Sequence, residues 1–377
     1  MMAAPMQRDS GVPLYLQVSE VLIQRILNGE WPTGSNLPAE PTLCVEFGVA
    51  RGTVRQALSK LEDEGYIRRE RGRGTFVIWG SELARAQGLS GSQIGFVVPY
   101  VRDSFVPAIL LGAERAAAEQ GLSITFKHVE NSPERQGAVL EDLVAQRLAG
   151  IVLYPVDSLH IEPMNRLIRV GYPMVLVDRY LRGVVCDYVM SDHFGGALRA
   201  TQHLIELGHE QIGFVSWHDP SISLEHRAAG YQRALVEAGL PHDPGLMFEV
   251  EGYPTVDLAP LCNFLTRQPG ITAILAANDQ IALAVYQAAR SVGRRIPYDL
   301  ALVGFDNLDF TMHLDVPLTT VAQQATNIGR HAIEVLMQRV HHQVDGWQQV
   351  ILPTQLIVRR SCGAWLKAEQ ARAETQS

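Results

Sequence analysis

Arginine is concentrated in one short part of this 377-residue chain, between Arg51 and Thr75. The stretch contains seven basic and four acidic residues, a net charge of about +3, whereas the whole chain has a net charge of −8. The basic residues are Arg51, Arg55, Lys60, Arg68, Arg69, Arg71 and Arg73. Guanidinium groups donate hydrogen bonds to phosphates and base edges, so a local basic patch on an acidic protein indicates a nucleic-acid contact confined to one face.

A second group of polar side chains follows apolar, β-prone runs in the larger C-terminal part of the chain. These residues are Asp178, Arg179, Trp217, Ser221, Arg227, Asn278, Asp279, Gln280, Asp306 and Gln323. Carboxylates and amides bind vicinal hydroxyl groups, and an aromatic side chain covers the apolar face of a ring, so the set suits a polyol. Taken singly, each residue is equally well explained as a cap on the next helix. The set together favours a binding site.

The basic stretch lies in a segment whose pattern predicts three helices and a β-hairpin. Apolar residues recur at helical spacing from residue 14 to 26, a shorter helix is expected in 37–47, and a third runs from about 52 to 64. Two β-prone runs then flank the glycine-arginine tip Arg71–Gly74. In the third helix, inward positions are Val54, Ala57, Leu58 and Leu61, and outward positions are Gly52, Arg55, Gln56 and Ser59. This order predicts a winged helix-turn-helix, whose third helix enters the major groove.

Residues 13–78 resemble the GntR-type winged-helix domain through the stretches PLYLQV, GEWPTGSNLPAE, GVARGTVRQALSKLEDEGYIRR and GRGTFV. The sequence departs from that family's pattern in two places. Pro41 stands where an arginine commonly follows LPSE, and the usual Ser/Thr-Arg-Thr/Ser-Thr is Ala-Arg-Gly-Thr at residues 50–53. These departures predict an unusual operator preference. The resemblance and the outward-facing pattern together give the expected DNA-binding residues Arg51, Gly52, Thr53, Arg55, Gln56, Arg71, Gly72 and Arg73.

From Ile94 onward, short β-branched runs alternate with helical patterns. Strands are predicted at 94–99, 123–129, 150–156, 173–178, 211–217, 272–278 and 301–306, and helices at 107–120, 133–146, 194–207, 226–238, 279–291 and 328–340. The alternation is typical of parallel sheets covered by helices on both faces, and about 270 residues of it favour two lobes. Because ligands lie beyond the carboxyl ends of such strands, we expect a site in the cleft between the lobes.

Residues 92–362 resemble the effector domain of the lactose- and purine-repressor family, which is itself similar to periplasmic sugar-binding proteins. The matching stretches include IGFVVP, HLIELGHEQIGFV, AAGYQRALVEAGL, TAILAANDQIALAVYQAARSVGRRIPYDLALVGFDN, PLTTVAQ and LPTQLIVRRSC. Position by position, the resemblance implies effector contacts from Asp178, Arg227, Asn278 and Asp306, and a stacking aromatic at Tyr253. It also implies contacts from Asp103, Phe105 and Gln323.

The amino-acid composition limits which classes of protein and which cellular locations the sequence allows. Apolar residues make up 47% of the chain and charged residues 19%, which predicts complete cores in two or three domains. The four cysteines are far apart and form no CxxC pair, which is typical of reduced thiols. The N-terminal residues lack the apolar core of a signal peptide, and no apolar run reaches the roughly 18–20 residues of a membrane span. We therefore expect a cytoplasmic protein that has no membrane segment, metal or cofactor.

The predicted organisation has four parts. A small α+β winged-helix domain (1–80) and a linker (81–92) precede an α/β two-lobed, periplasmic-binding-protein-like domain (93–362), and residues 363–377 form a tail. The first lobe is expected at about 93–190 and 325–347, and the second at about 191–324 and 348–362.

The two resemblances imply a ligand-responsive transcription regulator. It would bind double-stranded operator DNA as a homodimer and be released by a small sugar, such as L-arabinose or another pentose. No catalytic residues are expected. One alternative is a pyridoxal-phosphate enzyme fused to a GntR-like head, which needs a Schiff-base lysine; outside the head the sequence offers Lys127 and Lys367. A solute-binding protein is the other alternative, opposed by the missing signal peptide and the DNA-binding head.

Overall fold

The computed structural model describes residues 13–375 apart from 28–29, 32–33, 64–65, 71–72, 78–91, 147, 157–160, 170, 220, 252–254, 342 and 345. The predicted linker therefore lies outside the described residues, except for Ser92. In the described part of the chain, no helix is both long enough and apolar enough to cross a membrane.

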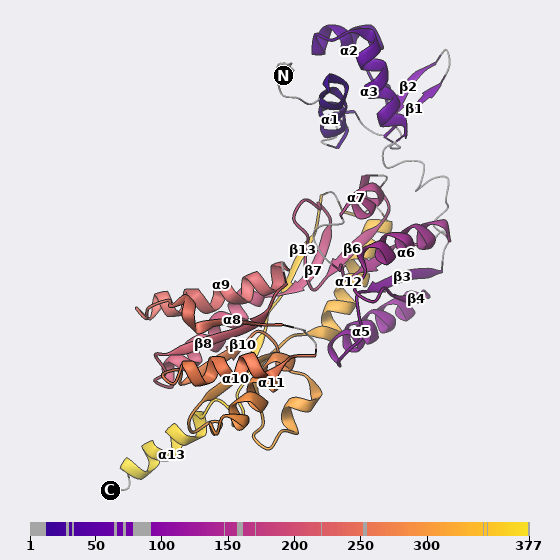
Figure 1. Ribbon diagram of the computed structural model, residues 1–377. Coiled ribbons are helices and arrows are strands. Elements are labelled where there is room, and N and C mark those ends of the chain that lie inside the picture. The colour runs from indigo at the N-terminus through magenta and orange to yellow at the C-terminus, as the bar shows by residue number, and fades with distance from the viewer. Residues whose placement is uncertain are drawn as a thin grey trace.

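The N-terminal part consists of three helices and a two-stranded hairpin, as predicted (Figure 1). The elements are α1 (Leu14–Leu27), α2 (Glu40–Phe47), α3 (Arg51–Asp63), β1 (Ile67–Glu70) and β2 (Gly74–Val77). Pro41 fits within the first turn of α2, and Gly48 ends that helix with a φ of 63° that favours glycine. The four residues predicted to face inward on α3 are all buried against α1 and α2, which leaves the opposite face of α3 to solvent.

The described residues of the remaining chain form two six-stranded sheets, one in each of the two predicted lobes. The sequence predicted seven of these twelve strands and missed those at 187–191, 247–250, 319–322, 349–352 and 355–357. The first has the strand order β13-β7-β6-β5-β3-β4 and the second β14-β12-β11-β10-β8-β9; all neighbours are parallel except the antiparallel pair β12–β14. The strands are β3 (Gln93–Val98), β4 (Ser123–His128), β5 (Ile151–Leu153), β6 (Met174–Val177), β7 (Asp187–Ser191), β8 (Ile212–Trp217), β9 (Met247–Val250), β10 (Ala273–Ala276), β11 (Ala301–Asp306), β12 (Thr319–Ala322), β13 (Gln349–Leu352) and β14 (Gln355–Ile357).

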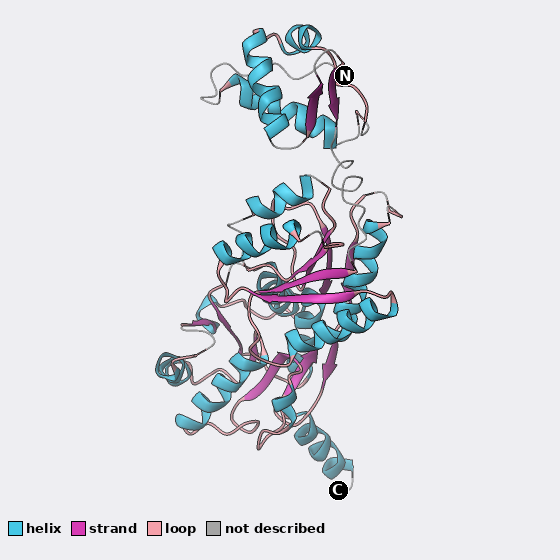
Figure 2. Cartoon of the chain, turned by 90° about the vertical axis from the view of Figure 1, so that its right-hand side faces the viewer, coloured by secondary structure: helices cyan, strands magenta, loops and turns pink. Residues whose placement is uncertain are grey.

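Helices cover both faces of each sheet (Figure 2). They are α5 (Phe105–Glu119), α6 (Pro133–Ala145), α7 (Glu162–Arg169), α8 (His193–Glu206), α9 (Ile222–Glu237), α10 (Leu258–Arg267), α11 (Asp279–Ser291) and α12 (Ala325–Val340); α13 (Ala364–Thr375) follows the last strand. On the first sheet α5 and α12 pack on one face and α6 and α7 on the other. On the second sheet α8 and α9 oppose α10 and α11. This double burial explains why the strands are continuous apolar runs.

The chain crosses between the two sheets three times, after β7, after β12 and after β13. The prediction that 348–362 belongs wholly to the second lobe is wrong, because β13 pairs with β7 in the first sheet. Asp187 fixes this pairing: its carboxylate accepts hydrogen bonds from the Gln348 backbone N–H (2.6 Å) and from Arg339 Nε (2.9 Å). Pro353 then marks the crossing, and only β14 joins the second sheet.

Helices α5 and α12 lie in backbone contact on the first sheet. A Cβ atom on Gly329 would fall 1.9 Å from the carbonyl oxygen of Ile109, and one on Gly112 would fall 1.9 Å from the carbonyl oxygen of Thr326. Only glycine at both positions permits this approach, and it brings the N-terminal ends of the two helices together.

The close contact predicts a large effect of a single methyl group. Gly329→Ala should cost at least about 1–3 kcal/mol of unfolding free energy, because rigid backbone atoms must separate. Gly270→Ala is the control, since a Cβ there meets nothing within 4 Å. Urea unfolding of the two variants measures the difference. Equal midpoints would show that α5 and α12 are not packed as described.

Candidate functional site

The exposed face of α3 carries the residues predicted to contact DNA. Gly52, Arg55 and Gln56 are exposed as expected, Arg51 begins the helix, and Thr53 is half-buried. A Cβ atom on Gly52 would meet nothing within 4 Å, so the helix surface is open and flat there. Such a surface allows the helix backbone to approach a groove closely.

Both arginines of this face share one acidic partner that the sequence analysis missed. The carboxylate of Glu40, the first residue of α2, accepts a hydrogen bond from Arg51 Nε (2.9 Å) and one from Arg55 Nε (3.1 Å). These bonds, that from Arg51 above all, lower the pKa of Glu40. Both guanidinium groups remain more than half exposed, so each can still reach a ligand.

The arginines of the hairpin also have acidic partners. Arg68 and Arg73 both contact Glu70 at 2.8 Å, and Arg69 contacts Glu62 at 2.6 Å. The predicted contacts Arg71 and Gly72 lie outside the described residues. The basic corner is therefore a set of exposed ion pairs, which exchange partners at little cost.

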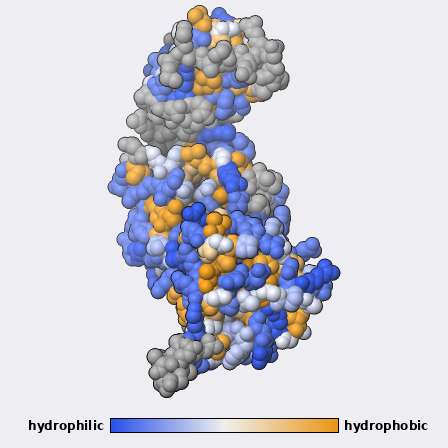
Figure 3. Space-filling view, turned by 90° about the vertical axis from the view of Figure 1, so that its left-hand side faces the viewer, coloured by the Kyte–Doolittle hydropathy of each residue, from blue (hydrophilic) through white to orange (hydrophobic). Residues whose placement is uncertain are grey.

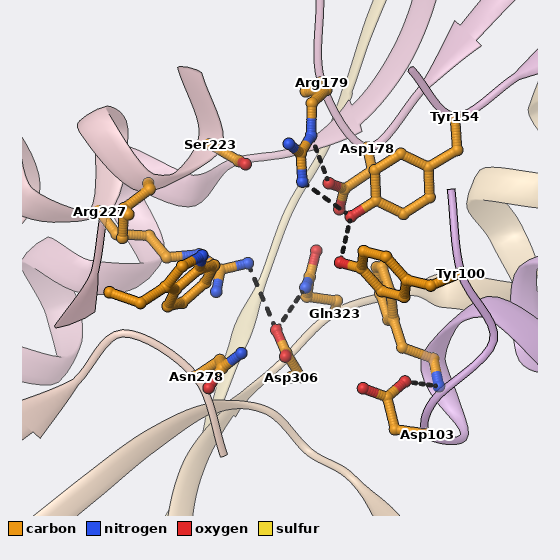
Figure 4. A pocket seen from close by; sticks show the side chains of 13 residues that line it. Tyr100, Asp103, Tyr154, Asp178, Arg179, Ser223, Arg227, Asn278, Asp306 and Gln323 are labelled. Atoms are coloured by element: carbon orange, nitrogen blue, oxygen red, sulfur yellow. Dashed lines mark hydrogen bonds and ion pairs between the residues drawn. The ribbon is translucent and has the colours of Figure 1, made fainter. Parts of the chain in front are cut away.

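Seven of the eight predicted effector residues line one cavity between the two sheets (Figure 4). They are Asp103, Phe105, Asp178, Arg227, Asn278, Asp306 and Gln323, around about 440 Å³ of space. Tyr253 lies outside the described residues. The convergence follows from the topology, because parallel strands place the residues after their carboxyl ends at one edge.

Further residues line the same cavity. Arg179 and Trp217 were among the polar and aromatic side chains noted after strands, whereas Tyr100, Tyr154, Ser223 and Leu224 were not predicted. Tyr154 directly follows β5 and Tyr100 lies two residues after the end of β3, so the strand-end signal was present for them too. Of the strand-end candidates, Ser221, Asp279 and Gln280 are not part of the lining.

Arg227 is held by partners on several sides. Its Nη1 donates to the carbonyl oxygen of Ala277 (2.6 Å), and its Nη2 lies 3.3 Å from Asp306 Oδ1. The guanidinium carbon sits 3.9 Å from the centre of the Phe305 ring, a cation–π contact. The side chain is buried, so these contacts replace the water it loses and fix its direction.

His193 connects this arginine to the first lobe. Arg227 Nε donates to His193 Nδ1 (3.3 Å), and His193 Nε2 donates to the carbonyl oxygen of Asp178 (3.1 Å). A carbonyl oxygen only accepts, so Nε2 carries a proton, and arginine only donates, so Nδ1 carries none. The ring is therefore neutral. Burial, and next the charge of Arg227, lower the pKa of His193 well below its usual range.

Two of the three carboxyl groups that line the site sit on strained backbone. Asp178 has a φ of 68° and Asp306 a φ of 111°, both in the region that favours glycine. Such conformations cost of order 1–3 kcal/mol and concentrate at binding sites. Asp306 Oδ1 also accepts a hydrogen bond from Gln323 Nε2 (2.7 Å), which orients both side chains.

Burial raises the pKa of Asp306 to about 7, opposed mainly by the charge of Arg227. A second buried carboxyl, Asp279, lies behind it and accepts hydrogen bonds from Thr320 Oγ1 (2.6 Å) and the Leu308 backbone N–H (2.8 Å). Burial, and then the charge of Asp306, raise the pKa of Asp279 well above its usual range. The two carboxyls therefore resist being ionised together.

The first-lobe side of the cavity is polar as well. Arg179 Nη2 donates to the Tyr154 hydroxyl (3.0 Å), and Arg179 Nη1 lies 3.6 Å from Asp219 of the second lobe. Among the described residues, the buried Gln323 Oε1 accepts no hydrogen bond. A buried acceptor of this kind is normally satisfied by a ligand or a water molecule. The site thus offers carboxylates, amides, guanidinium groups and aromatic rings without an excess of positive charge.

A winged-helix head and a two-lobed binding domain on one chain define a class of proteins, the ligand-responsive transcription regulators. Residues 14–77 match the gntR family of bacterial regulatory proteins, and residues 201–362 match the periplasmic binding protein-like domain.

Three known proteins are similar over most of the chain. An arabinose metabolism transcriptional repressor of Geobacillus stearothermophilus is 31% identical over 368 residues, which cover 94% of this chain and 99% of that protein. A repressor of the same name from Halalkalibacterium halodurans is 28% identical, covering 96% and 99%. The solved complex of the transcriptional regulator CelR with cellobiose has a TM-score of 0.68 and 26% identity, covering 86% of this chain and 100% of that one. The chain belongs to the family of transcriptional repressors that join a gntR-type head to a periplasmic-binding-protein-like domain.

The raised pKa of Asp306 predicts a pH dependence of stability. Its pKa rises from 3.8 to about 7 on folding, so the native state holds this proton more tightly than the unfolded chain. The stabilisation that the protonated Asp306 carboxyl provides is complete below about pH 4 and is lost as the pH rises through 7. The free energy of unfolding falls by up to about 1.4 kcal/mol per pH unit over this range. Thermal unfolding of wild type and Asp306→Asn between pH 5 and 8 measures it. The melting temperature of the variant should depend less on pH than that of the wild type. An equal pH dependence of the two melting temperatures would contradict the raised pKa of Asp306.

Proposed function

We propose that this repressor binds operator DNA as a homodimer and is released when its cleft binds a small, uncharged sugar. The observation that carries the proposal is the convergence of seven predicted polar and aromatic residues on one cavity between two lobes. The function includes no catalytic step and implies a cytoplasmic protein, since it acts on chromosomal DNA.

In the head, α3 is the element that enters the major groove. Arg55 and Gln56 read base edges, while Arg51, Thr53 and the hairpin residues Arg71, Gly72 and Arg73 contact phosphates or the neighbouring groove. Gly52 leaves room for the DNA backbone at the start of the helix. Phosphates would replace Glu40 as the partner of Arg51, because the ion pairs are exposed.

In the body, the ligand would contact both lobes at once. Asp103, Phe105 and Asp178 precede the first crossing, whereas Arg227 and Asn278 belong to the second lobe. A ligand that contacts both sides binds more tightly when the lobes are closed, and it shifts the population toward that state. Release from DNA follows if the closed state positions the two heads of a dimer unfavourably for the operator.

Charge and similarity narrow the choice of effector. Three carboxyls and two guanidinium groups line the cavity, so no surplus of positive charge favours a phosphate. The names of two relatives refer to arabinose and the similar solved structure holds cellobiose. L-Arabinose or another pentose is therefore the first candidate for the ring that binds in the cavity.

A dimer agrees with the surface of the body and with the expected roughly palindromic operator. Hydrophobic residues gather in patches among hydrophilic ones on the face that Figure 3 shows. Exposed large apolar side chains of the body include Leu111, Phe126, Val185 and Ile351. Phe126 and Ile351 lie on the two opposite edge strands of the first sheet, so association of two bodies through one edge would cover only some of these side chains.

The placement of α3 is tested with Arg55→Ala. Loss of a base contact should weaken operator binding about 10- to 100-fold and reduce the preference over random duplex at about 150 mM salt. Arg69→Ala is the control: it removes one charge from the hairpin and should weaken binding to both DNAs equally. Fluorescence anisotropy with the chain's own upstream DNA measures both. Unchanged operator affinity of Arg55→Ala would exclude this position for α3.

The sugar response is tested with Arg227→Ala. At a hundred times its dissociation constant, a true effector adds about 2.7 kcal/mol to the stability of the wild type. Arg227→Ala should lose this thermal shift and the release from operator, while its DNA binding without sugar stays intact. Gln323→Ala, a half-buried position, serves if loss of the buried arginine prevents folding. An unchanged response of both variants to L-arabinose, other pentoses and hexoses would place the effector elsewhere.

A further inference from the structure

An ion pair joins the two lobes outside the lining of the cavity. Arg182 lies between β6 and β7 of the first lobe, and its guanidinium donates through Nη1 to Glu225 Oε1 (3.1 Å) and through Nη2 to Glu225 Oε2. Glu225 lies in the first turn of α9, a helix of the second lobe. A bidentate contact of this kind has a defined geometry, so it constrains the distance between two elements of different lobes.

A contact between two rings accompanies this ion pair. Tyr180 of the first lobe meets His226 of the second lobe edge-on, with 6.2 Å between the ring centres. Tyr180 also packs on Tyr188 of β7, with 5.2 Å between the ring centres, so the first sheet supports it. We call Tyr180, Arg182, Glu225 and His226 the latch, because together they connect the two lobes.

The latch lies on the same two segments as several effector residues. In the first lobe Arg179 lines the cavity, and the latch residues follow it within three positions. In the second lobe Leu224 and Arg227 line the cavity, and the latch residues are the two between them. None of the four latch residues belongs to the lining. The latch therefore brings two walls of the cavity together without contacting a molecule that binds there.

The chain crossings join the lobes in a different way. Thr354 Oγ1 donates to the carbonyl oxygen of Asp192 (3.3 Å), and Gln324 Nε2 donates to that of Pro353 (2.9 Å), so the three crossing segments bond to one another. The covalent chain and these bonds hold the crossings together when the lobes move. The latch has only side chains across the gap. Opening of the lobes about the crossings must therefore break it.

The exposure of the ion pair indicates how strongly it acts. The side chain of Arg182 is 69% exposed and that of Glu225 is 39% exposed. Ion pairs exposed to this degree change an equilibrium constant by about 1.5- to 5-fold. The apparent dissociation constant of a ligand is its intrinsic value divided by the fraction of protein in the binding-competent state. The pair is therefore strong enough to adjust effector affinity and too weak to keep the lobes closed by itself.

We propose, on the basis of the sugar-responsive function above, that Arg182 and Glu225 are positioning residues that set the effector affinity. They favour the closed arrangement of the lobes, which binds the sugar, and they do not contact the sugar. The sugar concentration that releases the operator thus depends on an ion pair outside the site. Because salt screens an exposed pair, effector affinity decreases as the salt concentration rises, although the sugar is uncharged.

The test is a double-mutant cycle, measured by calorimetric titration of the full chain with L-arabinose, D-ribose, D-glucose and cellobiose. Arg182→Glu places two carboxylates opposite each other and should weaken binding of the preferred sugar about 5-fold. Glu225→Arg should also weaken it. The double variant restores an ion pair and should bind the sugar more tightly than either single variant. The cycle cancels the separate cost of an arginine in the first turn of α9.

Arg233→Glu is the matched control. It breaks an ion pair of similar exposure with Glu237 (2.7 Å), which lies on the same helix but within one lobe. Sugar affinity of this variant should stay within about 1.5-fold of the wild type, because the pair does not connect the lobes.

Salt provides a readout that a folding defect would not change. Between about 50 mM and about 1 M KCl, sugar binding should weaken in the wild type and strengthen in Arg182→Glu, because salt screens an attraction in the first and a repulsion in the second. Equal affinities of these two proteins, or an equal salt dependence, overturns the role of the pair and leaves the sugar-responsive function standing. Absence of binding of all four sugars by the wild type overturns both.

Discussion

The buried guanidinium of Arg227 is the constraint on which the ligand site depends. A buried cation is costly unless every side of it is compensated, and here a carboxylate, a carbonyl oxygen, a neutral imidazole and an aromatic ring surround it. The four partners come from three elements: Phe305 and Asp306 end β11, Ala277 follows β10 and His193 begins α8. The arginine therefore fixes the relative positions of these elements. Through His193 it also reaches Asp178 in the first lobe.

The same cluster explains how the site can be both ordered and ready to bind a ligand. Asp306 is shared between Arg227 and Gln323, and burial favours its protonated form until the pH approaches neutrality. A ligand hydroxyl that donates to this carboxylate favours the ionised form, so binding and proton release are linked near pH 7. Gln323 Oε1 gains its missing partner in the same step. Gln323 directly follows β12, where the chain crosses between the lobes.

The sequence allowed most of the fold and the body site to be predicted, because both follow from local patterns. Apolar runs located seven strands, and the rule that parallel strands present their carboxyl ends together brought Asp178, Asn278 and Asp306 to one cavity. The errors have a different origin. The pairing of β13 with β7 depends on a contact between Asp187 and residues more than 150 positions away, which no local pattern encodes. Glu40 was missed for the same reason, since its bonds depend on the angle between α2 and α3.

Glu40 also shows how an acidic chain can carry a DNA-binding surface. Unpaired arginines on the exposed face of α3 would attract any polyanion, whereas arginines bonded to Glu40 must exchange that partner for a phosphate or a base. Replacing Glu40 by a DNA group costs little free energy where the arginine makes a well-aligned bidentate contact, and more where the contact is poorly aligned. The cost is therefore greatest for binding to non-specific DNA. Pro41 removes a positive charge that related domains place beside Glu40, which leaves Arg51 and Arg55 as the partners of this carboxylate among the described residues. Arg51 and Arg55 therefore reach DNA only by exchanging Glu40 for a phosphate or a base.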